Sequence, residues 1–478
     1  MEKLYLQNRW KLNDKSLSYY GIRKFPYTTI NTIKLSKSLV ASFLKDADGN
    51  ITYSGKIGRE ATRLIDENIL VPKEKLLTTP SSLENARICK NCIANDFIIP
   101  GIEFDGNGLC PMCAQAELNK NLIAPLPIRQ EFPSSTKSRF DVAIFYTGGK
   151  DSTYLLYYFS KVLNLRVLAM TWEIPFMSEN ARKSIENAKK HLRNVEFVNR
   201  YVAPEQMNVM YKDLIKRQDN TCACPTIAYL LFFPTLVAEK VPYLILGNEP
   251  AQTAALYYNS MAPKIVYNFS KKPFLLGLMN FLRVLSFKKP VKSGQYEFGT
   301  MLKQLIYGST LIAKFGKYKN PLTENVISSL DAIENLKNSL KPMFRYADRG
   351  ARLPSLVHFD LNQAFDDGVY DWTKTIQIIK RETGWIPPDV GNKALHTSCC
   401  VEIAKDYSQF IHFYKMDTPV IPFSALEISI ASAVGTISRE KALEELKNHL
   451  GFTLTRPDEH LLMHQCNGCS ILMKDLKK

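Results

Sequence analysis

Apolar residues from position 139 onward occur in two arrangements, continuous runs and stretches with helical spacing. Residues 140–146 and 166–172 are almost continuous apolar runs, which predict parallel strands buried on both faces. Residues 152–163, between these runs, carry apolar side chains at helical spacing, so the three segments predict a βαβ unit. The same pattern predicts two more helices and a further strand, at residues 179–193, 225–240 and 242–247 respectively. We therefore expect an α/β fold with a doubly wound parallel sheet.

The remaining pattern divides the chain into six segments. Residues 1–85 form a mixed, polar segment of unassigned role, in which residues 60–70 predict a helix that Pro72 ends. The α/β pattern occupies residues 139–260. The other four segments are a cysteine-rich module, a Pro- and Ser-rich linker, a basic insertion and a mainly helical region, at residues 86–118, 119–138, 261–320 and 321–478.

Composition and charge narrow the classes of protein. With 478 residues, 45% of them hydrophobic, the chain can bury a full core, and its 22 glycines and 25 prolines exclude collagen-like or low-complexity character. The 62 Lys and Arg residues exceed the 46 Asp and Glu residues, and the net charge of +16 indicates a polyanionic partner or substrate: a nucleotide, a nucleic acid or an anionic membrane. The sequence has no signal-peptide pattern and no stretch near the roughly 20 apolar residues of a membrane span. We expect a cytoplasmic protein, and peripheral binding to a membrane is the alternative.

A glycine-rich segment lies between the first predicted strand and its helix. It consists of six residues, Thr147, Gly148, Gly149, Lys150, Asp151 and Ser152. The two glycines allow a tight turn whose N–H groups face an anion, and the helix N-terminus and the hydroxyls of Thr147 and Ser152 add to this binding. Lys150 supplies a positive charge, whereas Asp151 would repel a phosphate unless it held Mg²⁺. These six residues are therefore the predicted phosphate-binding loop, with Lys150 and Asp151 as its catalytic residues.

The loop differs from the two most familiar phosphate-binding motifs. It lacks the Gly-Lys-Ser/Thr that follows in a Walker A motif, and it lacks the third glycine of the dinucleotide fingerprint. It resembles the Ser-Gly-Gly-x-Asp-Ser signature of the PP-loop ATP pyrophosphatases, whose fold is HUP-like, with Thr147 in place of the first serine. The resemblance implies cleavage of ATP to AMP and pyrophosphate, with the acceptor adenylated in between. An ordinary glycine-rich turn is the alternative.

Two further segments belong to this resemblance. In the family, the residues just beyond the second strand reach the adenine, which implies a cofactor-binding role for Thr171 within residues 170–172. Residues 246–252 end a later strand at the same sheet edge, where open α/β sheets bind ligands. Gly247 and Gln252 are the predicted cofactor-binding residues there, and a simple turn is the alternative.

The first four cysteines form two close pairs, an arrangement in which one turn of the backbone offers two thiolates to an ion. Two residues separate Cys89 from Cys92 and Cys110 from Cys113, and 17 residues lie between the pairs. This spacing predicts a zinc-ribbon-like four-cysteine module, in which zinc would fold a segment too small to fold alone. The module looks like the N-terminus of the bacterial N-acetyl sugar amidotransferases of surface polysaccharide biosynthesis, where it also precedes a PP-loop domain. That resemblance implies an adenylated sugar oxygen displaced by ammonia from a separate glutaminase subunit.

A second set of cysteines leaves several chemistries open. Cys222 and Cys224 precede the predicted buried helix, and Cys399 and Cys400 lie far downstream. The PP-loop sulfur transferases that thiolate tRNA resemble this arrangement, in which Cys222, Cys224 and one of Cys399 or Cys400 would hold a [4Fe–4S] cluster with one iron open. A second zinc site, a persulfide with Cys222, Cys224 and Cys399 as catalytic residues, and two unrelated buried pairs are the alternatives. A further candidate metal pair comes near the end of the sequence, Cys466 and Cys469.

The positive charge is concentrated in one segment. Residues 264–319 contain eleven basic residues and one acid, Glu297, a local excess of +10 within the +16 of the chain. Residues 274–287 are apolar except for a narrow line of Asn280, Arg283 and Ser286, which predicts a helix at a membrane surface or in the core. The lysines around it could bind tRNA phosphates or a pyrophosphate-linked sugar, or remain solvated.

Two enzyme functions and one binding function fit these features. The four-cysteine module favours an ATP-dependent amidotransferase, whereas the second cysteine set favours a sulfur transferase that acts on tRNA or a small molecule. A nucleotide-binding scaffold without turnover is the third, and the intact loop with Asp151 argues against it. Both enzymes share the adenylation step, so the sequence predicts ATP cleavage more directly than it predicts the acceptor.

Overall fold

The structure is a computed structural model of the chain. It describes residues 3–20, 22, 30–99, 101–115, 131–132, 137–173, 177–203, 205–207, 209–210, 213, 224–247, 249–252, 273–308, 326–327, 329–387 and 422–448. The chain divides into two compact units. The first consists of Met1–Ala116, Gln409–Ala433 and Arg439–Arg456, and the second of Glu117–Ser408, Val434–Ser438 and Pro457–Lys478.

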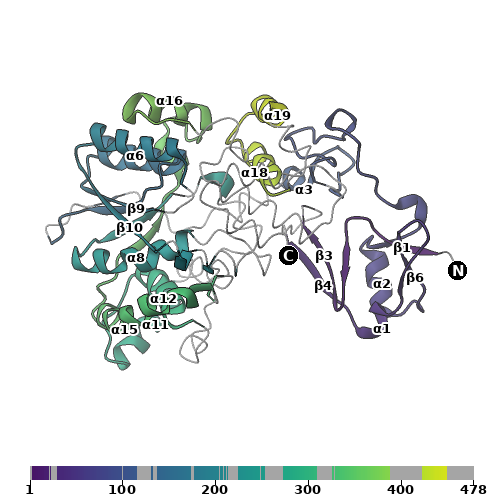
Figure 1. Ribbon diagram of the computed structural model, residues 1–478, viewed down its shortest axis with the longest axis horizontal. Helices are drawn as coiled ribbons and strands as arrows, with labels where there is room; N and C mark the ends of the chain where they lie inside the picture. Colours follow the sequence, from purple (N-terminus) through teal and green to yellow (C-terminus); the bar gives the residue numbers. More distant parts are fainter. Residues whose placement is uncertain are drawn as a thin grey trace. The chain divides into compact units, whose positions relative to one another are not determined.

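The second unit contains a five-stranded, all-parallel sheet (Figure 1). Its strands in chain order are β8 (Val142–Phe145), β9 (Val167–Glu173), β10 (Val195–Tyr201), β11 (Tyr243–Leu246) and β12 (Ser355–His358). They lie side by side in the order β10-β9-β8-β11-β12, so the chain first builds outward on one side of β8 and then restarts on its other side with β11. In open sheets of this kind, ligands bind beyond the carboxyl ends of the strands where the order reverses, which here is between β8 and β11.

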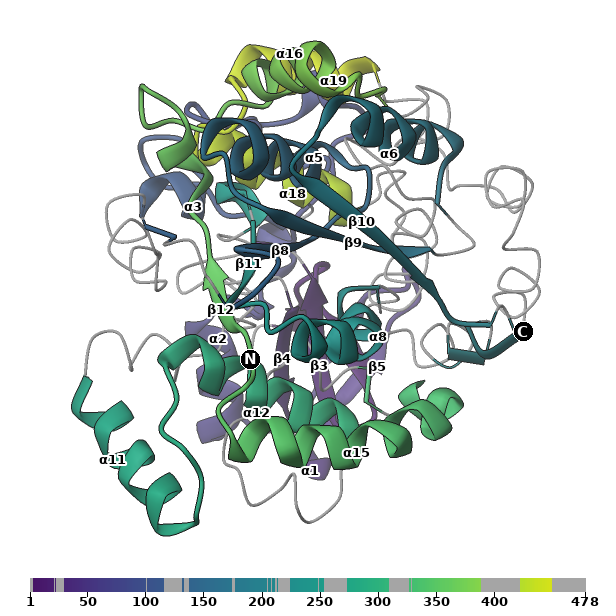
Figure 2. The ribbon, with the colours of Figure 1, turned by 90° about the vertical axis from the view of Figure 1, so that its left-hand side faces the viewer.

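Helices cover both faces of this sheet (Figure 1, Figure 2). One face carries α5 (Lys150–Tyr157), which continues as a π-helix (Tyr158–Val162), together with α6 (Glu179–His191) and α16 (Trp372–Thr383). The other face carries α8 (Cys224–Ala238), α12 (Ser293–Tyr307) and α15 (Glu334–Arg349). The apolar side chains of β8 and β9 are buried because both of their faces are covered, and Leu168, Phe232 and Leu305 share one core. The predicted α/β class and parallel sheet are confirmed.

The sequence pattern does not predict two of the five strands. β10 forms one edge of the sheet and leaves its side chains half-buried or exposed, so it has no continuous apolar run. β12 has four residues and lies beyond the range 139–260 that shows the α/β pattern, in a region expected to be mainly helical. It pairs with β11, Tyr243 opposite Ser355. A strand this short is stabilised by its partner strand more than by its own pattern.

The first unit contains two antiparallel sheets in the segment of residues 1–85. One sheet has the strand order β5-β6-β1-β7 and the other β2-β3-β4. The strands are β1 (Leu4–Leu6), β2 (Lys11–Asn13), β3 (Ser16–Tyr20), β4 (Ile30–Lys34), β5 (Phe43–Lys45), β6 (Ile51–Tyr53) and β7 (Leu70–Val71). Helix α1 (Lys37–Val40) precedes β5, and α2 (Arg59–Asp66) confirms the helix expected at residues 60–70. Trp10, Leu17 and Leu64 lie in the apolar core of these elements.

The first unit also contains the cysteine module. Helix α3 (Pro111–Ala114) belongs to this module, α18 (Pro422–Ala433) contacts α3, and α19 (Arg439–Asn448) packs against α18. The side chain of Arg9 is buried, and its Nη2 lies 2.6 Å from Oε1 of Glu103 in the module. The remaining short 3-10 helices of the described chain are Lys73–Lys75, Leu83–Asn85, Ser329–Ile333 and Leu361–Ala364.

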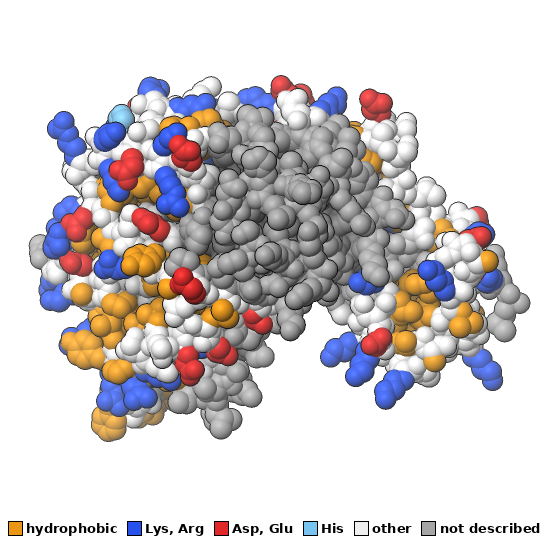
Figure 3. Space-filling model, viewed as in Figure 1, with side chains coloured by type: hydrophobic (Ala, Val, Ile, Leu, Met, Phe, Trp, Pro, Cys, Tyr) orange, Lys and Arg blue, Asp and Glu red, His pale blue; other side chains and the backbone are white. Residues whose placement is uncertain are grey.

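One helix of the second unit lies at its periphery. Helix α11 (Pro273–Leu285) confirms the helix expected at residues 274–287, and none of its 13 residues is buried. Figure 3 shows apolar side chains in orange beside basic ones in blue at the lower left, where Figure 1 labels α11 and α15. Among the described residues, we find no helix with the length and the apolar character needed to cross a membrane.

Candidate functional site: a glycine-rich loop and a four-cysteine group

The glycine-rich loop connects β8 to α5 at the carboxyl end of the sheet, beside the reversal of strand order. Gly148 has a φ of +73°, a left-handed conformation that glycine adopts without strain. A Cβ at this position would lie 2.5 Å from the backbone oxygen of Ala181 in α6. The carbonyl of Gly148 accepts a hydrogen bond of 3.0 Å from Nε1 of Trp385. The loop backbone is therefore fixed between α6 and the segment that follows α16.

The loop presents hydroxyl and N–H groups at the sheet edge. The hydroxyls of Thr147 and Ser152 lie 3.3 Å apart, and the N–H of Gly149 donates to Oγ1 of Thr147 at 3.4 Å. Gly149 is the N-cap of α5, and no side chain in the described part of the chain caps this helix end. Because the first N–H groups of a helix have no partner within it, these groups and the helix dipole could bind an anion.

Lys150, the first residue of α5, lies in a buried group of polar and aromatic side chains. Its ammonium donates to Asp151, to the hydroxyl of Tyr370 at 2.8 Å and to Oε2 of Glu249 at 3.3 Å. The ammonium lies 5.1 Å from the ring centroid of Tyr370 and 4.9 Å from that of Trp372, within the range of cation–π attraction. The side chains of Lys150 and Glu249 are 9% and 2% exposed, so this ion pair is inside the protein.

The members of this cluster come from three segments that are distant in the sequence. Glu249 follows β11, and Nε1 of Trp372 donates to its Oε2. Tyr370 and Trp372 flank Asp371, the N-cap of α16, which accepts a hydrogen bond of 2.9 Å from the N–H of Lys374. This cap fixes the start of α16, and with it the two aromatic side chains that enclose the ammonium of the loop lysine.

Burial and charge shift the pKa values of the cluster. Burial raises the pKa of Glu249 to about 7, although the charge of Lys150 opposes this shift. Burial acts to lower the pKa of Lys150, but Asp151 and Glu249 reverse this effect, so that its pKa lies above the usual value. Burial also raises the pKa of Tyr370 well above its usual value. Lys150 therefore keeps its charge near neutral pH, where Glu249 titrates.

Asp151 has one oxygen engaged and one oxygen open. Its Oδ1 accepts hydrogen bonds from Lys150 and from the hydroxyl of Tyr370. Its Oδ2 has no hydrogen-bond partner among the residues that the structure describes, and the side chain is 21% exposed. An accessible carboxylate oxygen beside an anion site is a ligand that suits a hard divalent cation.

Thr171, the first predicted cofactor contact, is a residue of β9. The N–H of Tyr146, just before the loop, donates to the carbonyl of Met170 at 2.9 Å, so Thr171 lies beside the start of the loop on the neighbouring strand. Thr171 and Trp172 are buried, and their polar atoms Oγ1 and Nε1 have no hydrogen-bond partner within the described chain. A buried polar atom without a partner costs about 1–3 kcal/mol, a cost that a polar ligand would remove.

The second predicted contact segment is placed only in part. Gly247 follows β11 and packs against α5, so a Cβ there would lie 1.9 Å from Cδ1 of Leu155. Gln252 is half-buried and has no hydrogen bond to the loop among the described residues. Of this segment, Glu249 reaches the loop, by its ion pair with Lys150.

The sequence prediction does not include three members of the cluster. Glu249 lies within the predicted segment 246–252, but no charge partner is visible for it there. Tyr370 and Trp372 lie in a region that predicts mainly helices, and 220 positions separate Tyr370 from Lys150. The one available signal is Asp371, an N-cap residue between two large aromatic residues, and it does not identify what those rings contact.

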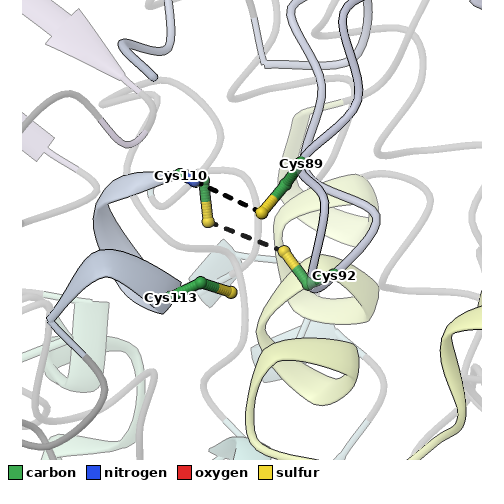
Figure 4. A group of neighbouring side chains, drawn as sticks. All are labelled: Cys89, Cys92, Cys110 and Cys113. Carbon is green, nitrogen blue, oxygen red and sulfur yellow. Dashed lines mark hydrogen bonds between the residues drawn. The ribbon is translucent and has the colours of Figure 1, made fainter. Parts of the chain in front are cut away.

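The four cysteines of the predicted module come together in the first unit. Figure 4 shows Cys89 and Cys92 on one loop and Cys110 and Cys113 at α3, with their sulfurs directed at one another. All four are buried, their sulfurs lie within 4.8 Å of one another, and the Sγ atoms of Cys92 and Cys110 are 3.6 Å apart. Four sulfurs bound at about 2.3 Å to one tetrahedral ion would lie about 3.8 Å apart. The group could therefore hold a metal ion.

N–H groups surround the sulfurs and fix their directions. The Cys110 N–H donates to Cys89 at 3.3 Å, the Ala94 N–H to Cys92 at 3.4 Å, and the Asn91 amide to Cys113 at 3.5 Å. Such donors orient metal ligands and stabilise thiolates.

A distant helix supports the loop that carries the first cysteine pair. Arg439, the first residue of α19, donates from Nε to the carbonyl of Cys92 at 3.2 Å and from Nη2 to that of Cys89 at 3.3 Å. The start of α19 therefore contributes to the cysteine module.

The four thiols shift one another's pKa values in opposite directions. Hydrogen bonding with Cys110 is the largest cause that lowers the pKa of Cys89 and of Cys113. The pKa of Cys92 is raised, chiefly by Cys110, and that of Cys110 is raised, chiefly by Cys113. Four thiolates this close together require a positive charge among them, which a bound metal ion supplies.

Several predicted residues lie outside the described residues. They are Cys222, Cys399, Cys400, Cys466 and Cys469. The backbone of Cys224 begins α8. Within the described ranges, the cysteine module is the one group of potential metal ligands, so the second cysteine set remains a sequence prediction.

No protein-family model and no curated protein matches the chain. The possible chemistry of the two groups therefore follows from their geometry. The loop can bind a phosphate-like anion through N–H and hydroxyl groups, Lys150 can pair with that anion, and Asp151 can hold a cation beside it. The cysteine group can hold a metal ion through four thiolates.

Proposed function

We propose that the chain is an adenylating enzyme of the PP-loop ATP pyrophosphatase type, which binds ATP at the glycine-rich loop and cleaves it to AMP and pyrophosphate. The observation that carries this proposal is the position of the loop. It follows β8 at the reversal of strand order and leads into a helix that no described side chain caps, with Lys150 and Asp151 in its first turn. The order of the loop residues supports the same class.

The loop residues divide the binding of the nucleotide among them. The N–H groups at Gly148 and Gly149 and the hydroxyls of Thr147 and Ser152 would donate to phosphate oxygens. The unpartnered Oγ1 of Thr171, at the end of β9, supports a polar contact with the adenine or ribose. Asp151 would hold Mg²⁺ through its open Oδ2, and the bound ion supplies positive charge beside the phosphates.

Lys150 changes partners in this scheme. Without a nucleotide it pairs with Asp151 and Glu249, and a bound phosphate would attract its ammonium away from Glu249. Glu249 can take up a proton as this happens, since its pKa is about 7. The protonated carboxyl is neutral. The protein thereby avoids a buried, unpaired carboxylate, which would cost several kcal/mol.

The reaction that we propose has two steps. An oxygen of the acceptor attacks the α-phosphorus of ATP, the bond from this phosphorus to the bridging oxygen breaks, and pyrophosphate leaves. Ammonia then attacks the carbon that bears the adenylated oxygen, and AMP departs with that oxygen. The charge of Lys150 stabilises the leaving pyrophosphate.

We propose an N-acetyl sugar as the acceptor and a role in surface polysaccharide biosynthesis, because the order and spacing of Cys89, Cys92, Cys110 and Cys113 resemble those of the sugar amidotransferases. A separate glutaminase subunit in the cytoplasm would supply the ammonia. The buried sulfurs and their spacing support zinc as the metal, since zinc in structural sites takes four thiolates in a tetrahedron. Its role would be to fold the module, because no sulfur is exposed for catalysis among these four.

One preparation tests this function against sulfur transfer. The chain is purified without oxygen, its zinc and iron are measured, and AMP formation from ATP is assayed with ammonium or with a sulfide donor. We expect about one zinc per chain and AMP formation that depends on ammonium and on a nucleotide-linked N-acetyl sugar. Iron equivalent to a cluster, with AMP formation that depends on sulfide and tRNA, would establish the alternative at Cys222, Cys224 and Cys399 instead.

A further inference from the structure

Helix α11 carries its apolar face on the outside. Its exposed apolar side chains recur with helical spacing along one face, and the turn after the helix adds one more. They are Phe274, Leu278, Phe281, Leu282, Leu285 and Phe287, each between 47% and 94% exposed, and Val284, at the margin of this face, is 52% exposed. A helix at the surface of a globular protein normally turns such a face toward the core. In α11 an apolar face instead points outward, and the half-buried side carries Leu276 and Met279 together with Asn280 and Arg283.

The polar face of α11 attaches it to the protein. The amide of Asn280 donates to the carbonyl of Val291 at 3.0 Å and accepts from its N–H at 2.9 Å. The guanidinium of Arg283 lies 2.8 Å from Oδ1 of Asp348 in α15, and its Nε donates to the carbonyl of Lys289 at 3.0 Å. These bonds fix the orientation of the helix, so the outward direction of its apolar face is part of the fold.

The turn after the helix holds an aromatic ring in solvent at a backbone cost. Phe287 has a φ of +56°, a conformation that is strained for a bulky residue, and its side chain is 94% exposed. Two unfavourable features at one residue indicate a function for the exposed ring.

The charged residues of α11 and of the segment that follows it are mainly basic. Within residues 273–308 the basic residues are Arg283, Lys288, Lys289, Lys292 and Lys303. The single acid in this range, Glu297, is buried and lies 2.9 Å from Nε2 of His358. The surface next to the apolar face is therefore cationic, with Lys289 and Lys292 exposed.

A pocket beside α11 is also lined by more basic than acidic side chains. Its polar lining includes Arg283, Ser286, Lys288, Tyr296, Thr300 and Lys303, with Asp348 as its one carboxylate, and Met279, Leu282 and Phe344 add apolar walls. Asp348 pairs with Arg283 and Lys288, whereas Lys303 has no hydrogen-bond or ion-pair partner among the described residues. Burial, together with the charge of Lys288, lowers the pKa of Lys303, which an anion in the pocket would reverse.

We propose that α11 and the turn after it lie on the surface of a bilayer that contains anionic phospholipids. The apolar face enters the boundary between headgroups and acyl chains, Lys289 and Lys292 face the headgroups, and the pocket at Lys303 accepts a lipid phosphate. Apolar residues next to Lys and Arg are the combination that binds such surfaces. A second copy of the chain fits this face less well, because the cationic rims of the two copies would repel each other.

Vesicle flotation of the full chain tests this inference, and it is independent of ATP cleavage. The probes are vesicles of phosphatidylcholine alone and of phosphatidylcholine mixed with phosphatidylglycerol. We expect binding to the mixed vesicles that weakens with salt, since headgroup attraction is screened. The double variant Phe281→Asp, Leu285→Asp should lose this binding, and Lys289→Gln with Lys292→Gln should weaken it about thirty-fold, from about tenfold per 1.4 kcal/mol and about 1 kcal/mol per lysine.

Leu44→Asp is the matched control. Leu44 is an apolar residue of the first unit that is 56% exposed, so its replacement should leave vesicle binding unchanged. Circular dichroism checks that each variant is folded. The absence of binding to the mixed vesicles, or equal binding by the Phe281 and Leu285 double variant, would overturn the proposal. Self-association of the chain that the same double variant abolishes, without vesicle binding, would assign the face to a second copy and would also overturn it.

Discussion

The ammonium of Lys150 lies 3.3 Å from Oε2 of Glu249, and this ion pair joins the loop after β8 to the segment after β11. These are the two strands between which the strand order reverses. The pair therefore lies at the place where open α/β sheets bind their ligands.

Replacement of Lys150 by Met should destabilise the protein strongly, because it leaves Glu249 buried without its cation. We expect a loss of about 3 kcal/mol in the free energy of unfolding. The loss should be smaller at about pH 6 than at about pH 8, since at the lower pH the Glu249 carboxyl is protonated and needs no cation. Urea unfolding followed by circular dichroism measures both.

Lys161→Met is the matched control for this variant. Lys161 lies in the π-helix that continues α5, the helix of Lys150. Its Nζ is 3.3 Å from Oε2 of Glu382, but its side chain is 38% exposed. An exposed ion pair of this kind contributes about 0–1 kcal/mol. If the two lysine variants were equally stable, the buried cluster would not contribute as we describe.

Gly148→Ala should impair the loop through two effects. The φ of +73° disfavours alanine, and the new Cβ would lie 2.5 Å from the carbonyl oxygen of Ala181. Gly368→Ala isolates the first effect, because Gly368 has a φ of +68° and a Cβ there would have no atom within 4 Å. Calorimetric titration with Mg-ATP should give at least a roughly tenfold weaker affinity for Gly148→Ala and an unchanged one for Gly368→Ala. If the two variants bound Mg-ATP with equal affinity, the loop would not be the nucleotide-binding site.

The pair formed by the half-buried His358 and the buried Glu297 should make stability depend on pH. Burial acts to lower the pKa of His358, but attraction and hydrogen bonding from Glu297 raise it above the usual 6.5. A raised folded-state pKa gives stability that is complete below pH 6.5 and is lost as the pH rises through the folded-state value. Glu249 contributes a slope of the same sign, so the informative quantity is the difference between variants.

His358→Gln should therefore flatten the decline in the free energy of unfolding between about pH 6 and about pH 8.5. His191→Gln, at an exposed position at the end of α6, should keep the decline of the unmodified protein. Urea midpoints across this range measure the effect, and identical slopes for both variants would contradict it.

Metal removal should unfold the cysteine module. Cys92→Ser should lose the metal and the protection of residues 89–113 against hydrogen exchange, because a segment this small depends on its ion. Asn91→Ala should keep one metal per chain with an affinity about tenfold weaker, since it removes the amide that donates to Cys113 at 3.5 Å. Metal analysis and exchange measured by mass spectrometry check both variants. Full protection of Cys92→Ser would show that the module folds without the ion.

The sequence predicts those parts of the site that depend on residues close together in the chain. The spacing of Cys89, Cys92, Cys110 and Cys113 predicts a metal-ligand group, and the four sulfurs do converge. The glycine loop is recognisable because its strand and helix flank it directly. In both cases the local backbone determines which side chains meet.

The parts that the sequence does not predict depend on contacts between distant residues. Tyr370 reaches Lys150 across 220 positions, and Arg439 reaches the carbonyl of Cys89 across 350. Neither residue stands in a motif, and no local pattern specifies its partner. β12 likewise forms a strand because it pairs with the edge of β11. Its four residues are too few to show a strand pattern in the sequence.

The most direct test of the proposed function is the identity of the nucleotide that the chain makes from ATP. The chain is incubated with Mg-ATP, ammonium and a nucleotide-linked N-acetyl sugar, and the products are separated by anion-exchange chromatography. We predict AMP and pyrophosphate in equal amounts, and their loss in Asp151→Asn, which removes the carboxylate proposed to hold Mg²⁺. Formation of ADP and phosphate, or unchanged AMP formation in Asp151→Asn, would contradict the account.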